Sequence, residues 1–174
     1  MAKMNASRRG QLNRAEGAEF EKLIERSCEY YREKGIALIE KTPEPIRILT
    51  KVDNHGTFKA CFTKQAQPDF KGTLKGGKAI VFDAKCTMTD KIPISALSDE
   101  QVKCLTMHEN LGAISGVLMT FGFKAFAFMT VYRFLSAKEI VGHKHWTAYE
   151  AIKHGQPVRF TGTMIDFLEG IKNV

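Results

Sequence analysis

The sequence predicts a single α/β domain in which helices flank a mixed β-sheet. An amphipathic helix opens the chain, short apolar strands and helices then alternate, and two strongly apolar strands lie beyond the middle. Such alternation favours a layered α/β domain. The 174 residues suffice for one domain with a substantial core, and we assign residues 15–174 to it.

The first 14 residues are predicted to form a flexible basic arm. They carry four cationic side chains and no acidic one. Two interpretations fit this composition: a disordered tail, or an arm that wraps around DNA. The cationic residues are Lys3, Arg8, Arg9 and Arg14.

A helix and two strands are predicted next. Apolar residues recur at helical spacing over residues 15–34, and Gly35 ends the helix. Glu21 lies beside this apolar stripe. Alone it is typical of a solvated carboxylate, but it would reach a site on the sheet if the helix packs there. Residues 36–39 and 46–49 are predicted strands, separated by a segment whose two prolines disfavour regular pairing.

Residues 51–66 are predicted to form a protruding β-hairpin in which aromatic and basic residues alternate. Such a hairpin would suit nucleic acid, because aromatic rings stack on bases and lysines contact phosphates. The alternative is a hairpin whose phenylalanines belong to the core, which is the commoner case. The candidate DNA contacts in this segment are Lys51, Phe58, Lys59, Phe62 and Lys64.

The second half of the chain supplies a helix and the most apolar strands. Residues 98–112 are predicted to be helical, and Ser98 with Gln101 matches a capping box. Residues 114–121 and 125–131 are typical of strands buried on both faces at the centre of a sheet. Short helices are predicted at residues 136–141, 147–154 and 164–171.

The stretch on which the domain is centred carries two acids and a lysine. A turn contains Asp69, and the apolar strand of residues 79–85 ends with Asp83 and Lys85. Side chains alternate between the faces of a strand, so Asp83 and Lys85 project together. The glycine-rich segment between turn and strand favours a hairpin that would bring Asp69 beside Asp83.

These groups suit metal-assisted hydrolysis of a phosphodiester. Carboxylates hold Mg²⁺, which bridges to a phosphate and lowers the pKa of a bound water, and a lysine orients that water or stabilises the transition state. The pattern Pro-Asp, a gap and Asp-Xaa-Lys resembles the PD-(D/E)XK nucleases, whose fold is restriction-endonuclease-like. On these residues alone, the alternative is an exposed strand end with a solvated ion pair.

Charge and composition restrict the class of partner. The formal net charge of +7 favours a polyanion, and residues 51–80 hold six lysines, among them Lys71 and Lys75, against two acids. No apolar run reaches the length of a membrane span, and the N-terminus is not expected to be a secretory signal, because it has no apolar core segment. Four widely spaced cysteines without a Cys-Xaa-Xaa-Cys pair argue against structural zinc and fit buried, reduced thiols in a cytoplasmic protein.

Longer stretches resemble the RecU-type Holliday junction resolvases. Residues 30–45 contain Tyr-Tyr, Ile-Ala, Lys and two prolines in the order that this family shows after its first helix. Residues 69–85 contain Asp-Phe-Lys-Gly, a second Lys-Gly and Phe-Asp-Ala-Lys, similar to the family's second motif. Asp-Glu-Gln at residues 99–101 and Val-Tyr at residues 131–132 also fit. The resemblance covers residues 16–171, nearly the whole chain.

The resemblance implies a homodimeric, Mg²⁺-dependent endonuclease, with Mn²⁺ able to substitute, that cuts four-way DNA junctions symmetrically. By matching position, Asp69 and Asp83 would be metal ligands and Lys85 would stabilise the transition state. Gln101 matches a further site residue that we expect to contact the metal, and Glu21 matches a glutamate of the first helix. The hairpin would be a stalk that enters the junction, and a recombinase or branch-migration protein is a possible partner.

Two departures from the family pattern affect the site. Asp83 stands where the family usually has Glu, and Gln67 stands where it has a metal-contacting Thr. Two alternatives remain: another PD-(D/E)XK nuclease with a different DNA substrate, and a non-catalytic DNA-binding module.

Overall fold

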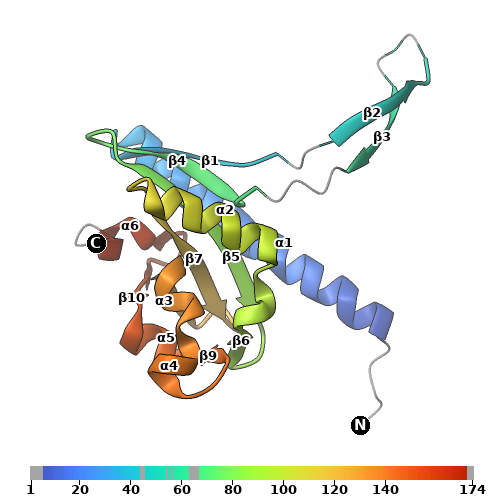
Figure 1. The fold of residues 1–174 in the computed structure, drawn as a ribbon. Helices are drawn as coiled ribbons and strands as arrows, with labels where there is room; N and C mark the ends of the chain where they lie inside the picture. Colours follow the sequence, from blue (N-terminus) through green and yellow to red (C-terminus); the bar gives the residue numbers. More distant parts are fainter. Residues whose placement is uncertain (1–5, 44–45, 54, 56, 63–66, 172–174) are drawn as a thin grey trace.

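The computed structural model describes residues 6–43, 46–53, 55, 57–62 and 67–171. It confirms the mixed α/β architecture, with a six-stranded sheet between helices (Figure 1). Only the β5–β7 pair of this sheet is parallel; the other neighbours are antiparallel. In sheet order the strands are β1 (Ala37–Lys41), β4 (Phe70–Leu74), β5 (Ala79–Thr87), β7 (Ile114–Phe121), β8 (Ala125–Thr130) and β10 (Gln156–Pro157).

Each face of the sheet has its own hydrophobic cluster. Helices α1 (Ala6–Glu33) and α6 (Phe167–Ile171) pack on one face, against side chains such as Phe82. On the other face, side chains such as Val81 contact α2 (Asp99–Asn110), α3 (Val131–Leu135), α4 (Ala137–Val141) and α5 (Ala148–His154). Because strand side chains alternate, Asp83 and Lys85 lie on the face of Val81, which we call the α2 face.

Helix α1 begins at Ala6 and not near residue 15. The prediction of a flexible arm is therefore wrong for residues 6–14, and residues 1–5 lie outside the described part. Arg, Gln and Leu are good helix formers, and they outweigh the cost of Gly10 in this segment. The N-terminal turns of α1 extend past the sheet (Figure 1), and from Arg8 onward Phe20 is the first buried side chain of the helix.

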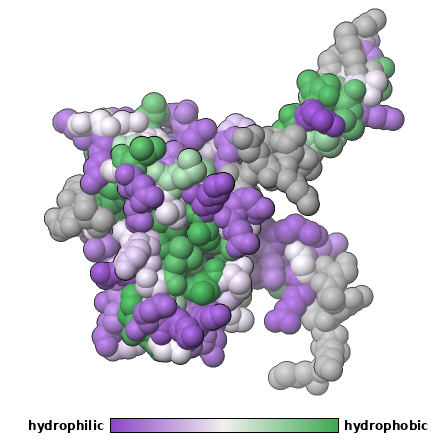
Figure 2. All heavy atoms as spheres, in the orientation of Figure 1, coloured by the Kyte–Doolittle hydropathy of each residue, from purple (hydrophilic) through white to green (hydrophobic). Residues whose placement is uncertain are grey.

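The protruding hairpin is confirmed, but its first strand differs from the prediction. Strands β2 (Ile46–Lys51) and β3 (Phe58–Phe62) pair antiparallel and form a separate two-stranded sheet. The prediction placed residues 46–49 outside the hairpin; in the structure they are its first strand. Figure 2 shows hydrophobic and hydrophilic side chains together on this projection.

The remaining elements are short. The strand predicted over residues 125–131 ends at Thr130, because the Thr130 hydroxyl caps α3, a helix that the sequence analysis did not separate. The predicted short helices correspond to α4, α5 and α6. The other elements are β6 (Lys91–Pro93), a 3₁₀ turn (Ile94–Ala96), β9 (His145–Thr147), β11 (Arg159–Phe160) and β12 (Ile165–Asp166).

Two expectations from composition can be compared with the structure. In the described ranges, no helix is long and apolar enough to cross a membrane. All four cysteines are free thiols, but only Cys28 is buried; Cys61, Cys86 and Cys104 are partly exposed, which differs from the expectation of buried thiols.

Candidate active site

Asp69 and Asp83 face each other at one end of the β4–β5 pair. The register joins Phe70 to Phe82, so one further step places Asp69 opposite Asp83. The Asp69 N–H donates to Asp83 Oδ1 at 3.2 Å, and the Ala84 N–H donates to Asp69 Oδ2 at 2.9 Å. Each carboxylate is thus held by the backbone of the other segment, and the predicted convergence of the two acids is confirmed.

Asp83 is fully buried, and three donors hold its carboxylate. Besides Asp69 N–H, Lys85 Nζ lies 2.8 Å from Asp83 Oδ2, and Gln101 Nε2 donates to the same oxygen. A buried charge is tolerated only when it is paired and hydrogen-bonded. The side chain of Asp83 has no exposed surface, whereas that of Lys85 keeps 19% exposed. The alternative of an exposed, solvated ion pair is therefore wrong for Asp83.

Burial and the negative charge of Asp83 raise the pKa of Asp69 from 3.8 to about 6, although Lys85 and the Ala84 N–H act in the opposite direction. Two nearby carboxylates repel each other when both are ionised, so a positive charge beside them is stabilising. Their hard oxygens suit Mg²⁺, which is usually held by one or two carboxylates together with waters and phosphate oxygens. Among the described residues, no set of three His, Cys, Asp or Glu side chains could hold a metal ion. Two carboxylates alone fit an ion whose other positions are taken by waters and phosphate oxygens.

Gln101 reaches the acids from the N-terminus of α2. The capping box predicted with Ser98 is present: Gln101 N–H donates to Ser98 Oγ at 3.2 Å, and Ser98 N–H donates to Gln101 Oε1 at 3.0 Å. The other end of the same amide donates to Asp83. Gln101 is therefore both a capping residue and a neighbour of the acids.

Glu21 does not join the aspartates as a third acid. It lies on α1, which covers the opposite face, and its carboxylate pairs with Lys41 Nζ at 2.7 Å. Its charge adds only a minor contribution to the raised pKa of Asp69. The sequence analysis expected Glu21 to reach the site if its helix packs against the strand of Asp83. The helix does pack against that strand, but on the face opposite to the Asp83 side chain.

Thr42 is a neighbour that the sequence analysis missed. Its N–H donates to the Asp69 carbonyl at 2.8 Å, which continues the β1–β4 register. Its hydroxyl is buried and has no hydrogen-bond partner among the described residues. Only the strand register places Thr42 here, and that register is not readable from local sequence.

The predicted DNA contacts lie in three places. Arg8, Arg9 and Arg14 are exposed on the N-terminal turns of α1. The hairpin carries Phe58 and Lys59 as exposed side chains, places Lys51 and Phe62 within its strands, and leaves Lys64 outside the described residues. Lys71 and Lys75 are exposed along β4 and just after it; Lys71 shares the α2 face with Asp69. Their contact with DNA stays a prediction.

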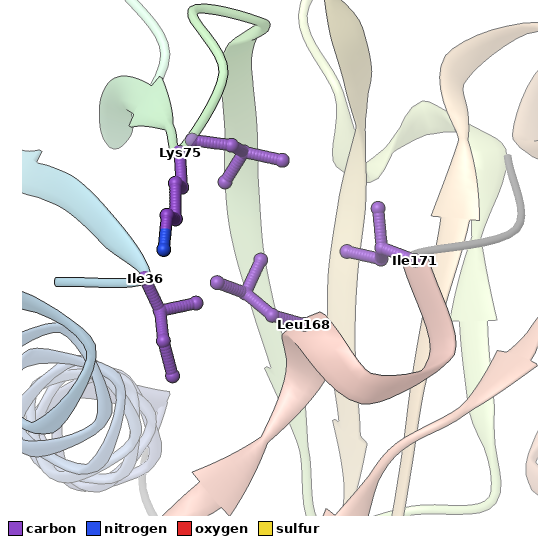
Figure 3. Close-up of a pocket in the computed structure, with 5 residues that line it drawn as sticks. Ile36, Lys75, Leu168 and Ile171 are labelled. Atoms are coloured by element: carbon purple, nitrogen blue, oxygen red, sulfur yellow. The ribbon is translucent and has the colours of Figure 1, made fainter. Parts of the chain in front are cut away.

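An apolar pocket of about 280 Å³ lies at the other end of β1 and β4 from the acids. Figure 3 shows Leu168 and Ile171 from α6 facing Ile36 and Lys75 across it. Among the described residues that line the pocket, Lys75 alone is charged, and they offer no carboxylate for phosphodiester chemistry.

Comparison with known proteins gives a consistent match. The family model described as "Recombination protein U" matches residues 15–173. A "Holliday junction resolvase RecU" of Pediococcus pentosaceus is 33% identical over 138 residues, which are 74% of this chain and 68% of the relative. The protein of that name from Geobacillus kaustophilus is 27% identical over 99% of this chain and 91% of its own.

Other matches are shorter or more distant. The Streptococcus gordonii protein of the same name is 32% identical over 111 residues, so the match spans 54% of that relative. A solved structure of a Holliday junction resolvase from Archaeoglobus fulgidus has a TM-score of 0.47 and 16% identity, over 76% of this chain and 91% of that one.

Proposed function

The chain belongs to the RecU family of recombination proteins, and we propose on this basis that it is a metal-dependent endonuclease that resolves four-way (Holliday) DNA junctions. One observation in this chain supports the activity: a converging Asp69–Asp83 pair with Lys85 and Gln101 on the same carboxylate oxygen. A decayed site would be expected to have lost one of these groups.

The side chains divide the chemistry among them. Asp69 and Asp83 would hold a divalent ion, which we propose to be Mg²⁺, replaceable by Mn²⁺; when bound it supplies positive charge at the phosphate and a water of lowered pKa. Lys85 Nζ, which Asp83 holds at 2.8 Å, has further N–H groups to offer to the attacking water or to a phosphate oxygen. Hydrolysis would leave a 5′-phosphate.

The DNA would be held by the basic and aromatic residues outside the acid pair. Lysines and arginines give affinity without sequence information, so junction selectivity would come from DNA shape. We propose that the β2–β3 hairpin enters the open centre of the junction and that two copies of the chain supply two sites for paired incisions. A recombinase or branch-migration protein would be the partner in the cytoplasm.

The test is cleavage of a labelled synthetic four-way junction beside a linear duplex and a Y-fork, with and without Mg²⁺. We expect paired nicks in opposing strands of the junction alone, and only with the metal. Equal cutting of all three substrates would leave a nuclease of another specificity. Binding without cutting in both Mg²⁺ and Mn²⁺ would favour a non-catalytic module.

A further inference from the structure

We propose that the apolar pocket between α6 and the β4–β5 turn binds the C-terminal residue of a partner protein, through its apolar side chain and its terminal carboxylate. Four apolar side chains and one ammonium group line this pocket: Ile36, Leu74, Lys75, Leu168 and Ile171. The acid pair lies at the opposite end of β1 and β4, and the proposed nuclease chemistry does not use the pocket. The inference therefore goes beyond the proposed function and does not depend on it.

Hydrogen bonds to Tyr31 fix two walls of the pocket. Ile36 N–H donates to the Tyr31 carbonyl at 2.9 Å, and Leu168 N–H donates to the Tyr31 hydroxyl at 3.2 Å. The same hydroxyl donates to Asp166 Oδ1 at 2.8 Å. Tyr31 is only 2% exposed, so the core holds it in place. The walls cannot close on each other without breaking these bonds, and the space between them is therefore preformed.

The size of the pocket suits one large side chain. Its volume is about 280 Å³, and an apolar cavity of about 150 Å³ is enough to bind benzene. An aromatic or branched aliphatic side chain therefore fits together with the carboxylate beside it. Leu168 and Ile171 are only 3% and 1% exposed, so an entering side chain would pack against residues of the core.

Lys75 supplies a positive charge at the edge of this apolar space. Its N–H donates to the Ile36 carbonyl at 2.8 Å, and Figure 3 shows its side chain extending along the pocket toward Ile36. Its ammonium group has no hydrogen bond or ion pair with another described residue. An ammonium group beside apolar walls attracts an anion more strongly than one surrounded by water. The pocket is thus complementary to an apolar group that carries a negative charge.

A chain terminus fits this combination better than other ligands. Nucleic acid would need aromatic rings for its bases and several cations for its phosphates, and the described lining offers one lysine and no aromatic ring. An internal segment of a partner would need room for the chain on both sides of the buried residue. A C-terminal residue carries its side chain and its carboxylate on one Cα, and capture of that carboxylate is a recurring mode of peptide recognition.

The test is fluorescence anisotropy with the peptide Gly-Ser-Gly-Ser-Gly-Phe, labelled with fluorescein at its N-terminus. We expect saturable binding that weakens about 10-fold or more when the terminal carboxylate is amidated, and by a similar factor when Ala replaces Phe. The ¹³C methyl signals of Ile36 and Ile171 should shift during the titration. Equal binding of the free acid and the amide, or unchanged methyl signals, would overturn the proposal.

Substitution of Lys75 tests the charge without disturbing the core, because this residue is exposed. Lys75→Gln should weaken binding of the peptide about 10-fold, whereas Lys75→Arg keeps the cation and should retain most of the affinity. Lys124→Gln removes the same charge from the exposed β7–β8 turn and should bind like wild type. Circular dichroism is the folding control. Wild-type affinity in Lys75→Gln would contradict the role of the ammonium group.

Two further measurements test other occupants. Octanoate is an apolar monoanion without a peptide, so methyl shifts with octanoate but with no peptide would mean that the ligand is a free acid and that the proposal is wrong. A gain in peptide affinity of about 10-fold or more on removal of residues 172–174 would mean that the chain's own end fills the pocket, which would also contradict it. These experiments need neither DNA nor metal, so they decide the inference whether or not the chain cuts junctions.

Discussion

Asp83 is the residue on which the site depends, and its burial explains its surroundings. A carboxylate without exposed surface needs partners for both oxygens, and here a backbone N–H, an ammonium and an amide supply them. Two of these donors, Lys85 and Gln101, are side chains of the proposed site. The interactions that make the buried acid tolerable thus also place the groups that the chemistry needs.

Replacing Asp83 tests whether it serves chemistry or DNA binding. Asp83→Ala should abolish cutting, because the proposed ion loses one of its two carboxylates, while junction binding in Ca²⁺ or EDTA stays within a few-fold of wild type. Electrophoretic binding and cleavage assays on one junction measure both, with circular dichroism as the folding control. An equal loss of binding and cleavage would assign Asp83 a structural role.

The raised pKa of Asp69 predicts how the free energy of unfolding of the metal-free protein changes with pH. The folded pKa of about 6 exceeds the ordinary 3.8, so ionised Asp69 lowers the free energy of unfolding above pH 6, and this cost disappears as the pH falls toward 4. At pH 7 Asp69→Asn should therefore be more stable than wild type by about 1–3 kcal/mol, and at pH 4.5 the advantage should shrink strongly.

Urea unfolding of both proteins at the two pH values measures this difference. Saturating Mg²⁺ at pH 7 should stabilise the wild type and hardly affect Asp69→Asn, because the ion offsets the repulsion only where the carboxylate exists. An Asn advantage that stays the same at pH 4.5 and pH 7 would contradict the raised pKa.

Thr120 carries a buried hydroxyl that has no role in the proposed mechanism, so replacing it measures the effect of that hydroxyl on the free energy of unfolding. Its side chain is fully buried, and its hydroxyl has no partner among the described residues. Thr120→Val keeps the shape and removes the unsatisfied hydroxyl, so the free energy of unfolding should rise by about 1 kcal/mol. Alternation from Leu118 places Thr120 on the α1 face, so cleavage should not change. Destabilisation would mean that the hydroxyl is satisfied in solution.

Single residues also show how far the sequence predicts this site. Asp69, Asp83 and Lys85 follow from period-two alternation and a hairpin, which are local rules. Glu21 could not be placed, because the sequence does not tell which face of the sheet its helix covers. The proximity of Thr42 depends on strand order, since β1 pairs with β4 across an intervening hairpin. Local patterns therefore predicted the acids but not the neighbours that come from distant segments.

At the scale of elements, the β2–β3 hairpin is the feature least explained by the fold. An isolated two-stranded hairpin is marginally stable in water, and this one exposes Ile46, Ile48, Leu49 and Val52 by half or more. The sequence predicted a hairpin but began it too late, because the two prolines suggested the end of one element and not the start of this one. Exposed apolar side chains on a projection fit a surface that acts against DNA or another chain.

Phe58 on this hairpin can be compared with a matched phenylalanine elsewhere. Phe58 is 45% exposed on β3, and Phe160 is 48% exposed on β11, where it stacks on Phe126. Stacking on a base contributes about 1–3 kcal/mol, so Phe58→Ala should weaken junction binding by about 10-fold with little change in stability. Phe160→Ala should leave junction binding unchanged. If both variants bind like wild type, the hairpin does not stack on the DNA.

At the scale of the whole molecule, the charge is distributed unevenly. The net charge is +7, and the basic residues gather in two groups: one on the hairpin and β4, where Lys71 lies on the same face as Asp69, and one on the exposed start of α1. Helix α1 begins at Ala6, nine residues before the predicted start, and this changes the interpretation of the N-terminal charges. Arg8, Arg9 and Arg14 are displayed along a helix that projects past the sheet (Figure 1), and not along a flexible tail as the sequence predicted; Lys3 lies outside the described residues.

This geometry makes a prediction about salt. Arg8, Arg9 and Arg14 can be replaced together by Gln, which keeps helix propensity while removing three charges. If each arginine meets a phosphate, junction affinity should fall, and the slope of log K against log salt should become shallower by about 3. Fluorescence anisotropy with a labelled junction from 50 to 300 mM salt, in Ca²⁺ to prevent cutting, gives the slope.

The matched control removes the same charge from another surface. Lys138, Lys144 and Lys153 are exposed around α4 and α5. Replacing these three lysines by Gln lowers the net charge equally, so any effect of overall charge alone would appear in both variants. A shallower slope only in the arginine variant would place DNA along α1. Equal slopes in both variants would mean that the projecting helix is not a DNA contact and that the affinity comes from the hairpin and β4.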